Sequence, residues 1–153
     1  MISPVDLMSA IYARAKTLGN GATLRAALGD SANSVLMATA LQAAMGQPDL
    51  STSLPARPFI ALDDGLIAFD AIGTAQTFTP MWLIYDEPGR HYAIRQIIPL
   101  LVALYTGDGA PAIRIATGGQ VGAIRIANVT RPRPDRNLGG LECSALQLQL
   151  YAI

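Results

Sequence analysis

The chain has 153 residues, of which 51% are hydrophobic and only 14% are charged, and its formal net charge is zero. This length suits a single domain, residues 1–153, that can bury a genuine core without disulfides or metals. The one cysteine, Cys143, excludes an internal disulfide and a cysteine-based zinc site. Neither a signal peptide nor a membrane-spanning run is recognisable, so we expect a soluble protein made in a reducing compartment.

The surface is poor in charge, because about a quarter of the residues of a typical soluble domain are charged. Such a surface indicates that copies of the chain or other partners cover part of it, although an ordinary alanine-rich domain would have a similar composition. Residues 1–89 contain four basic and eight acidic residues, whereas residues 90–153 contain seven basic and three acidic ones. This polarity would suit head-to-tail association of identical chains.

Helices are expected over about residues 3–45. A capping hydroxyl followed by proline at Ser3-Pro4 predicts the start of the first helix, and Gly19 can end it. A short helical turn is expected over 22–28, and a longer helix over 32–45. The inward positions of that longer helix would be Val35, Ala38, Leu41 and Met45.

A β-hairpin is predicted over about residues 58–73. Two apolar runs, 59–62 and 66–72, flank Asp63-Asp64-Gly65, which has the composition of a tight turn.

The stretch 78–105 predicts a strand, a turn and one central helix. Its strand is the aromatic and β-branched run 81–85, and Glu87-Pro88-Gly89-Arg90 has turn composition. Pro99 predicts either a bend in the helix or a helix that begins nearer to Pro99. The apolar stripe consists of Ile94, Ile97, Ile98, Leu101, Leu104 and Tyr105.

Three strands in succession are predicted after the central helix, over 112–116, 123–129 and 141–151. Each alternates aliphatic with polar residues, so each would bury one face and expose the other. The polar faces would present Arg114, Arg125, Gln147 and Gln149. Strands that follow a helix together, rather than alternating with helices, argue for an α+β fold in which N-terminal helices and one central helix pack on a mostly antiparallel sheet.

A basic arm, residues 131–140, lies between the last two of these strands. Two prolines stiffen it, two glycines end it and three arginines decorate it. An arm of this length in a compact domain is usually functional or disordered.

The sequence contains few groups that could form an active site. His91 is the single histidine and could pair with Cys143 or a serine, but nothing near it in the sequence would orient it. The glycine clusters lack the spacing of dinucleotide or phosphate loops, and Asp63-Asp64-Gly65 is too short for a calcium loop. We therefore expect no catalytic residue, no metal site and no cofactor.

Ten of the eleven basic residues are arginine, which suits interfaces and bidentate pairing with carboxylates or phosphates. No nucleic-acid recognition motif is present and the isoelectric point is about 6.5, so sequence-specific nucleic-acid binding is not expected. A protein partner is the preferred interpretation, with solvated loop charges as the alternative. The candidate interface residues are Arg114, Arg125, Arg131, Arg133, Asp135, Arg136, Asn137, Gln147 and Gln149.

The order of these elements resembles the tail terminator proteins, also called tail completion or neck proteins, of long-tailed bacteriophages. In that family a strand ending in a turn leads into one long helix, then strands, a loop with a charged segment and a closing strand. The corresponding pieces are MWLIYDEPGRHYAIRQIIPLLVALY, AIRIATGG, VGAIRIANV, RPRPDRNLGG and CSALQLQLYAI. The segments LMSAIYARAKTLGNGATLRAALGD and LPARPFIAL resemble the family's first helix and proline-flanked first strand.

The resemblance implies a structural virion protein of the tail-neck region, assembled in the host cytoplasm. It would be a homohexameric ring that docks on the last ring of tail-tube subunits, ends tube growth and presents a face to the head-side connector. No membrane partner is implied, and DNA would pass through the ring without specific contact. The arm 131–140 would strap an adjacent subunit or the tube, and the outward polar residues would lie on a subunit interface or line the channel.

Three departures from the family pattern keep alternatives open. The predicted helix 32–45 and hairpin 59–72 are longer than a minimal member needs, and Pro99 stands inside the central helix. A related neck or head–tail adaptor protein is one alternative. A small hydrolase using His91 and a ligand-binding α+β domain are others, and both would work as monomers, whereas the terminator requires a closed ring.

Overall fold

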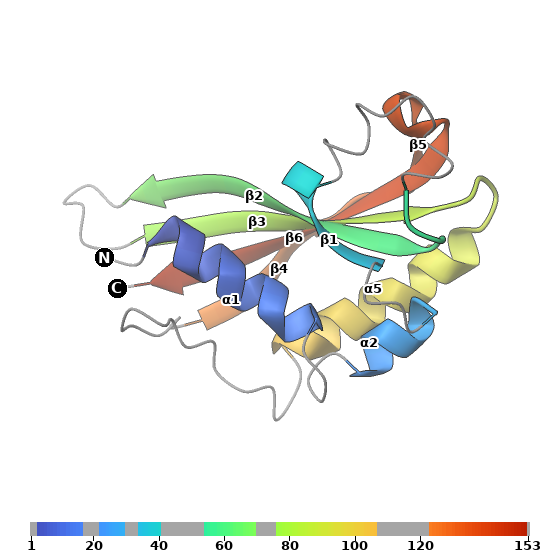
Figure 1. The fold of residues 1–153 in the computed structure, drawn as a ribbon. Coiled ribbons are helices and arrows are strands. Elements are labelled where there is room, and N and C mark those ends of the chain that lie inside the picture. The colour runs from blue at the N-terminus through green and yellow to red at the C-terminus, as the bar shows by residue number, and fades with distance from the viewer. Residues whose placement is uncertain are drawn as a thin grey trace.

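A computed structural model of the chain describes residues 3–16, 22–29, 34–40, 54–69, 76–106 and 123–152. Within these ranges, helices cover one face of a single β-sheet (Figure 1). The helices are α1 (Pro4–Lys16), α2 (Ala22–Ala27), α5 (His91–Thr106) and the short 3-10 helix η2 (Arg136–Leu138). The strands are β1 (Val35–Met37), β2 (Phe59–Phe69), β3 (Gln76–Asp86), β4 (Ala123–Val129), β5 (Arg133–Asp135) and β6 (Leu141–Ala152). None of the described helices has the length and apolarity that a membrane span requires.

The sheet is mixed but mostly antiparallel. Its strands lie in the order β1-β2-β3-β6-β4, and β5 also pairs with β6. β1 runs parallel to β2, and the remaining pairs are antiparallel. The α+β class predicted from the sequence is therefore confirmed.

The main core lies between the helices and the sheet. α1 contributes Leu7 and Ile11 to it, and α5 contributes Ile97 and Leu101, which belong to one buried cluster with Leu148 of β6. A spacing of three or four residues places each pair on one side of its helix, and the alternation of β6 turns every second residue toward the helices. The same periodicity predicted these positions from the sequence.

A hydrogen-bonded chain links three elements inside this core. Trp82 is fully buried in β3, and its indole Nε1 donates to the hydroxyl of Tyr105 in α5 at 3.1 Å. The Tyr105 hydroxyl donates in turn to the backbone carbonyl of Ile11 in α1 at 2.7 Å. The polar atoms of both aromatic side chains thus have partners, which makes their burial favourable.

The predicted strand, turn and central helix are confirmed as β3, the turn after Asp86 and α5. The helix begins at His91, so the alternative of a start nearer to Pro99 is wrong. Pro99 is exposed within α5. A missing backbone donor costs less there than in the core, because water can reach the carbonyl group that loses its partner.

The predicted helix over 32–45 is wrong at residues 35–37, whereas residues 38–40 are helical as predicted. Residues 35–37 form β1, which pairs with residues 60–62 of β2, and residues 41–45 lie outside the described ranges. The apolar spacing suited a helix, but hydrogen bonding to a neighbouring strand outweighed this local preference. The hydroxyl of Tyr12 further fixes β1 by donating to the Val35 carbonyl at 3.0 Å.

The predicted hairpin over 58–73 is also wrong. β2 continues as one strand through Asp63-Asp64-Gly65, where its register with β3 shifts in a β-bulge. Gly65 has φ +63°, and a Cβ atom there would lie 1.8 Å from the backbone oxygen of Thr79. The glycine therefore permits a close approach of two strands instead of reversing the chain.

The C-terminal strands agree with the sequence in part. The predictions over 123–129 and 141–151 correspond to β4 and β6, while residues 112–116 lie outside the described ranges. The helix over 22–28 corresponds to α2.

Candidate interaction surface

One face of the sheet has no α-helix on it in the described part of the chain, and only the short 3-10 helix η2 packs at one end of it. The buried side chains of Leu146, Leu148 and Leu150 in β6 belong to the helix-covered core. Because side chains alternate along a strand, Gln147 and Gln149 point to the opposite face, where they are half-buried. Figure 1 shows α1, α2 and α5 on the same side of this strand.

Cross-strand register assembles polar and amphipathic side chains on that face. Met81 of β3 stands between Asp63 of β2 and Gln147 of β6, and Gln147 stands opposite Asn128 of β4. We call the residues of this face the open sheet face; they are Asp63, Thr77, Met81, Arg125, Asn128, Gln147, Gln149 and Tyr151.

Arg125 is fixed on the open sheet face by two neighbours on β6. Its Nε donates a hydrogen bond to Oε1 of Gln149, which lies opposite it in the register. Its guanidinium also lies 5.8 Å from the ring centre of Tyr151, within the range of a cation–π contact. Arg125 and Tyr151 remain exposed, so both are ordered yet available to a partner.

The predicted basic arm is folded onto its own sheet. β5 pairs with the start of β6, and η2 turns the chain back, so residues 131–140 form the tip of a hairpin. Leu138 is 2% exposed and packs in a second small core, which lies on the same side of the sheet as the open sheet face. The other members of that core are Leu54, Phe59, Ala61, Tyr85 and Leu141.

The hairpin tip keeps its arginines in solvent. Arg131, Arg133 and Arg136 are exposed. Asp135 instead turns inward, and its Oδ2 accepts a hydrogen bond from the hydroxyl of Tyr85 at 3.4 Å. The tip thus presents a basic surface on a fixed backbone. Leu138, an apolar residue within the basic arm, is the sequence signal that could have indicated that the arm packs on its own sheet.

Cys143 lies beneath this tip, opposite Tyr85 in the register. Burial raises the pKa of the Cys143 thiol to about 11, and the hydrogen bond to Tyr85 only partly opposes this rise. Burial and the nearby Cys143 and Asp135 raise the pKa of Tyr85 as well. Since the thiolate is the nucleophilic form, Cys143 is suited to packing rather than to catalysis.

The structure brings together only some of the residues proposed for an interface. Arg125, Gln147 and Gln149 share the open sheet face, while the three arginines of the tip form a separate surface. Asn137 belongs to η2 and His91 begins α5, but the side chains of both lie outside what the structure describes, as does Arg114. Met81, Asn128 and Tyr151 were missed, although the alternation of their strands could have placed them beside Gln147 and Gln149.

Within the described ranges, no three His, Cys, Asp or Glu side chains are grouped so that they could hold a metal ion. No model of a known protein family matches the chain, and a comparison with curated proteins finds no match.

Proposed function

We propose that this chain is a structural subunit of a bacteriophage tail neck. Copies of it would form a closed ring that caps the tail tube, ends its polymerisation and joins it to the head-side connector.

 The hexamer is the ring size that the family resemblance implies. The observation that carries the proposal is the open sheet face, an ordered surface with no α-helix over it in the described residues.

The composition of the open sheet face supports a role in protein contacts. Tyr, Met and Arg are enriched in interfaces, and this face presents Tyr151, Met81 and Arg125. Lysine and glutamate are depleted in interfaces, and neither occurs among the eight residues that define the face. Only one carboxylate, that of Asp63, belongs to it.

The low charge of the whole chain supports assembly as well. With 14% charged residues, the chain leaves more of its surface to apolar and neutral polar groups than a typical monomer does. A ring of identical copies would cover part of that surface on every subunit.

Light scattering on the purified full chain tests the proposal. The mass is measured at several protein concentrations and salt levels, first alone and then with tail-tube protein. The mass of a closed ring, or a monomer that becomes a ring only on tube protein, is the expected result. A strict monomer that ignores tube protein would contradict the proposal. A ring that binds the head-side connector but not the tube would favour a head–tail adaptor instead.

A pair of variants tests whether the open sheet face carries the contact. Tyr151→Asp places a carboxylate beside Arg125 on this face, and we expect it to weaken assembly or tube binding. Gln96→Asp adds the same charge on the exposed side of α5 and should leave both unchanged. If the two variants assembled and bound tube protein equally well, the open sheet face would not be the interface.

A further inference from the structure

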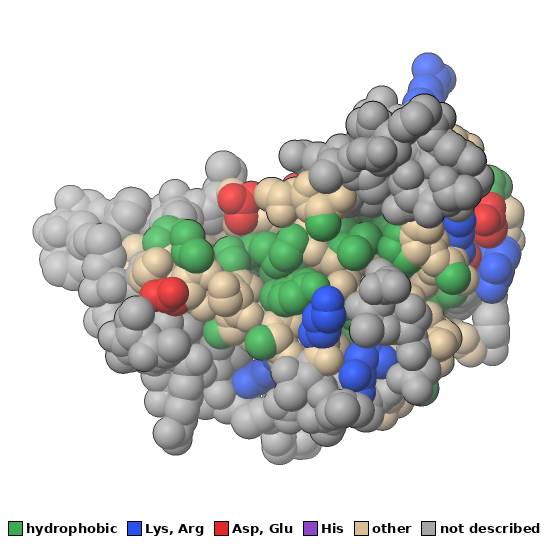
Figure 2. Space-filling model, in the orientation of Figure 1, with side chains coloured by type: hydrophobic (Ala, Val, Ile, Leu, Met, Phe, Trp, Pro, Cys, Tyr) green, Lys and Arg blue, Asp and Glu red, His purple; other side chains and the backbone are tan. Residues whose placement is uncertain are grey.

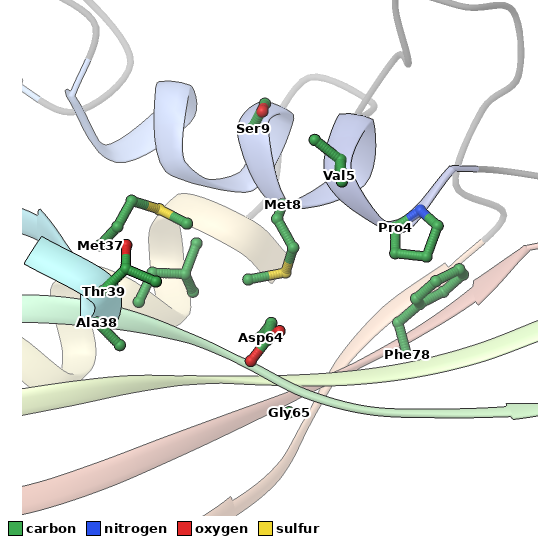
Figure 3. A pocket seen from close by; sticks show the side chains of 11 residues that line it. Pro4, Val5, Met8, Ser9, Met37, Ala38, Thr39, Asp64, Gly65 and Phe78 are labelled. Atoms are coloured by element: carbon green, nitrogen blue, oxygen red, sulfur yellow. The ribbon is translucent and has the colours of Figure 1, made fainter. Parts of the chain in front are cut away.

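A groove lies between the first turns of α1 and the strands β1 and β2. Met8, Met37, Leu62 and Phe78 give it an apolar lining, and its volume is about 270 Å³. Figure 3 shows Met8 pointing from α1 toward β2, with the carboxylate of Asp64 between Met8 and the strand. Figure 2 shows a band of hydrophobic side chains across this face of the molecule, with acidic groups near one end and basic groups along its lower edge.

The size of the groove favours a protein segment as its occupant. Pockets for drug-sized ligands usually enclose about 300–1,000 Å³, so this groove falls just below that range and suits one or two side chains. Its two methionines can adapt their shape to whatever enters. Val5 at its rim is 73% exposed, so its side chain is available to a partner that enters the groove.

The chemistry of the groove specifies what the segment should carry. An apolar lining with the exposed carboxylate of Asp64 is complementary to a segment that combines an apolar group with a positive charge. The hairpin tip has this combination, because Pro134 is exposed between the exposed side chains of Arg133 and Arg136.

The tip is also held ready for binding. The pairing of β5 with β6 and the burial of Leu138 fix its backbone, so little conformational entropy would be lost when it docks. The uneven distribution of charge along the chain also favours this pairing. The groove lies in the acidic N-terminal part of the chain, and the tip lies in the basic C-terminal part.

A single chain cannot place its own tip in its own groove. The tip packs over Tyr85, whereas the groove reaches Phe78, and these residues are roughly 20 Å apart along an extended strand such as β3. The two features also lie on opposite faces of the sheet, because Phe78 belongs to the helix-covered core and Tyr85 to the second core. Figure 1 shows β5 well away from the start of α1.

We propose that the hairpin tip of one copy docks in the α1–β2 groove of the next copy. Pro134 enters the apolar part of the groove, and Arg133 and Arg136 pair with Asp64. The contact joins two different surfaces of identical chains, and such a head-to-tail contact closes into a ring when its rotation allows. This inference rests on the proposed function, to which it adds the contact between subunits.

A charge swap in the full chain tests the pairing. Asp64→Arg alone, and Arg133→Asp with Arg136→Asp, each set like charges against each other, and each should weaken self-association about tenfold or more. The variant with all three substitutions restores opposite charges and should recover association. Arg95→Asp on the exposed side of α5 is the matched control and should associate like the wild type. Reversed variants that associate normally, or a combined variant that fails to recover although it is folded by circular dichroism, would overturn the contact.

Cross-linking tests the same contact without requiring a stable ring. In a Cys143→Ser background, Ser9→Cys in the groove and Pro134→Cys on the tip should together give a ladder of linked copies on oxidation, while either alone gives at most dimers. A ring that caps tubes but yields no ladder overturns this contact and leaves the proposed function standing. A ladder and charge-swap recovery in a protein that ignores tube protein support the contact and refute the proposed function. A chain that stays monomeric with tube protein present and gives no ladder there overturns both.

Discussion

Asp86 and Glu142 stand directly opposite each other where β3 and β6 pair, and Asp86 is fully buried. Oδ1 of Asp86 accepts a hydrogen bond from the backbone amide of Glu87 at 2.8 Å and lies 3.7 Å from Nη1 of Arg90. Oδ2 has no hydrogen-bond partner among the described residues. Burial raises the pKa of Asp86, the Glu87 amide and Arg90 oppose the rise, and the negative charges of Glu87 and Glu142 add to it.

This pair should make stability depend on pH. A carboxyl group whose pKa is higher in the folded than in the unfolded chain binds its proton more tightly when folded. Its contribution to stability is therefore present at low pH and is lost as the pH rises from the unfolded pKa through the folded one. Asp86→Asn should gain stability relative to the wild type as the pH rises above the unfolded pKa of about 4, as measured by urea unfolding.

The amide of Asp86→Asn can still accept from Glu87 and can donate toward Glu142, so the turn before α5 should survive. Gln96→Asp, which adds an exposed carboxylate on α5, is the control and should follow the wild type across the same pH range. The interpretation would be wrong if Asp86→Asn showed the pH dependence of the wild type.

The bulge in β2 should tolerate no side chain at Gly65. Gly65→Ala places a Cβ atom against the backbone oxygen of Thr79 and forces a positive φ on alanine, so we expect a loss of about 3 kcal/mol or more in unfolding free energy. Gly29→Ala is a matched control, since Gly29 also has positive φ but nothing within 4 Å of its Cβ position, and it should lose only about 1 kcal/mol. Equal losses in urea unfolding would show that the close approach of the strands is unimportant.

Docking of the hairpin tip should depend on Leu138. Leu138→Ala removes a nearly fully buried side chain from the small second core and should cost about 2–3 kcal/mol. Arg131→Ala, at an exposed position of the same arm, should change stability by less than about 0.5 kcal/mol. Urea unfolding measures both, and faster amide exchange in residues 133–143 of Leu138→Ala would locate the effect. A neutral Leu138→Ala would mean that the tip is not docked in solution.

The hydroxyl of Tyr105 should matter more than that of an exposed tyrosine. Tyr105→Phe leaves the buried indole N–H of Trp82 without its acceptor, so we expect a loss of about 1–3 kcal/mol. Tyr151→Phe, on the open sheet face, should lose less than about 0.5 kcal/mol. The single tryptophan of the chain reports both unfolding curves by fluorescence. If the unfolding curves of the two variants were indistinguishable, the hydrogen bonds of Tyr105 to Trp82 and Ile11 would not contribute measurably to stability.

Local sequence patterns predicted the elements whose periodicity matches their surroundings. The stripes of α1 and α5 and the alternation of β6 each have one buried face, and each was placed correctly. β1 was missed because Val35 and Ala38 also fit a helix, and only pairing with a strand more than twenty residues away decides between the two. The sequence around Gly65 predicts a turn rather than a bulge, because both structures use glycine at positive φ.

The alternation of side chains along a strand predicts which residues share a face of the sheet, but not how distant segments pack on that face. It placed Arg125 and Gln149 on one face, and the register then brought them into contact. It could not show that the basic arm folds back, because that depends on Leu138 and Tyr85, which are far apart in the sequence. Contacts between distant segments carry no local pattern, so the separation of the tip from the open sheet face needed the structure.

The position of β6 in the sheet has a consequence for synthesis of the protein. β6 lies between β3 and β4, yet it follows both in the sequence, so the sheet cannot close until β6 has left the ribosome. Translation adds roughly 5–20 residues per second, so the edge of β3 that will pair with β6 stays unpaired for on the order of several seconds. A nascent chain with such an open edge is prone to pair with its neighbours on the same messenger, so slow translation after β3 should lower the yield of native protein.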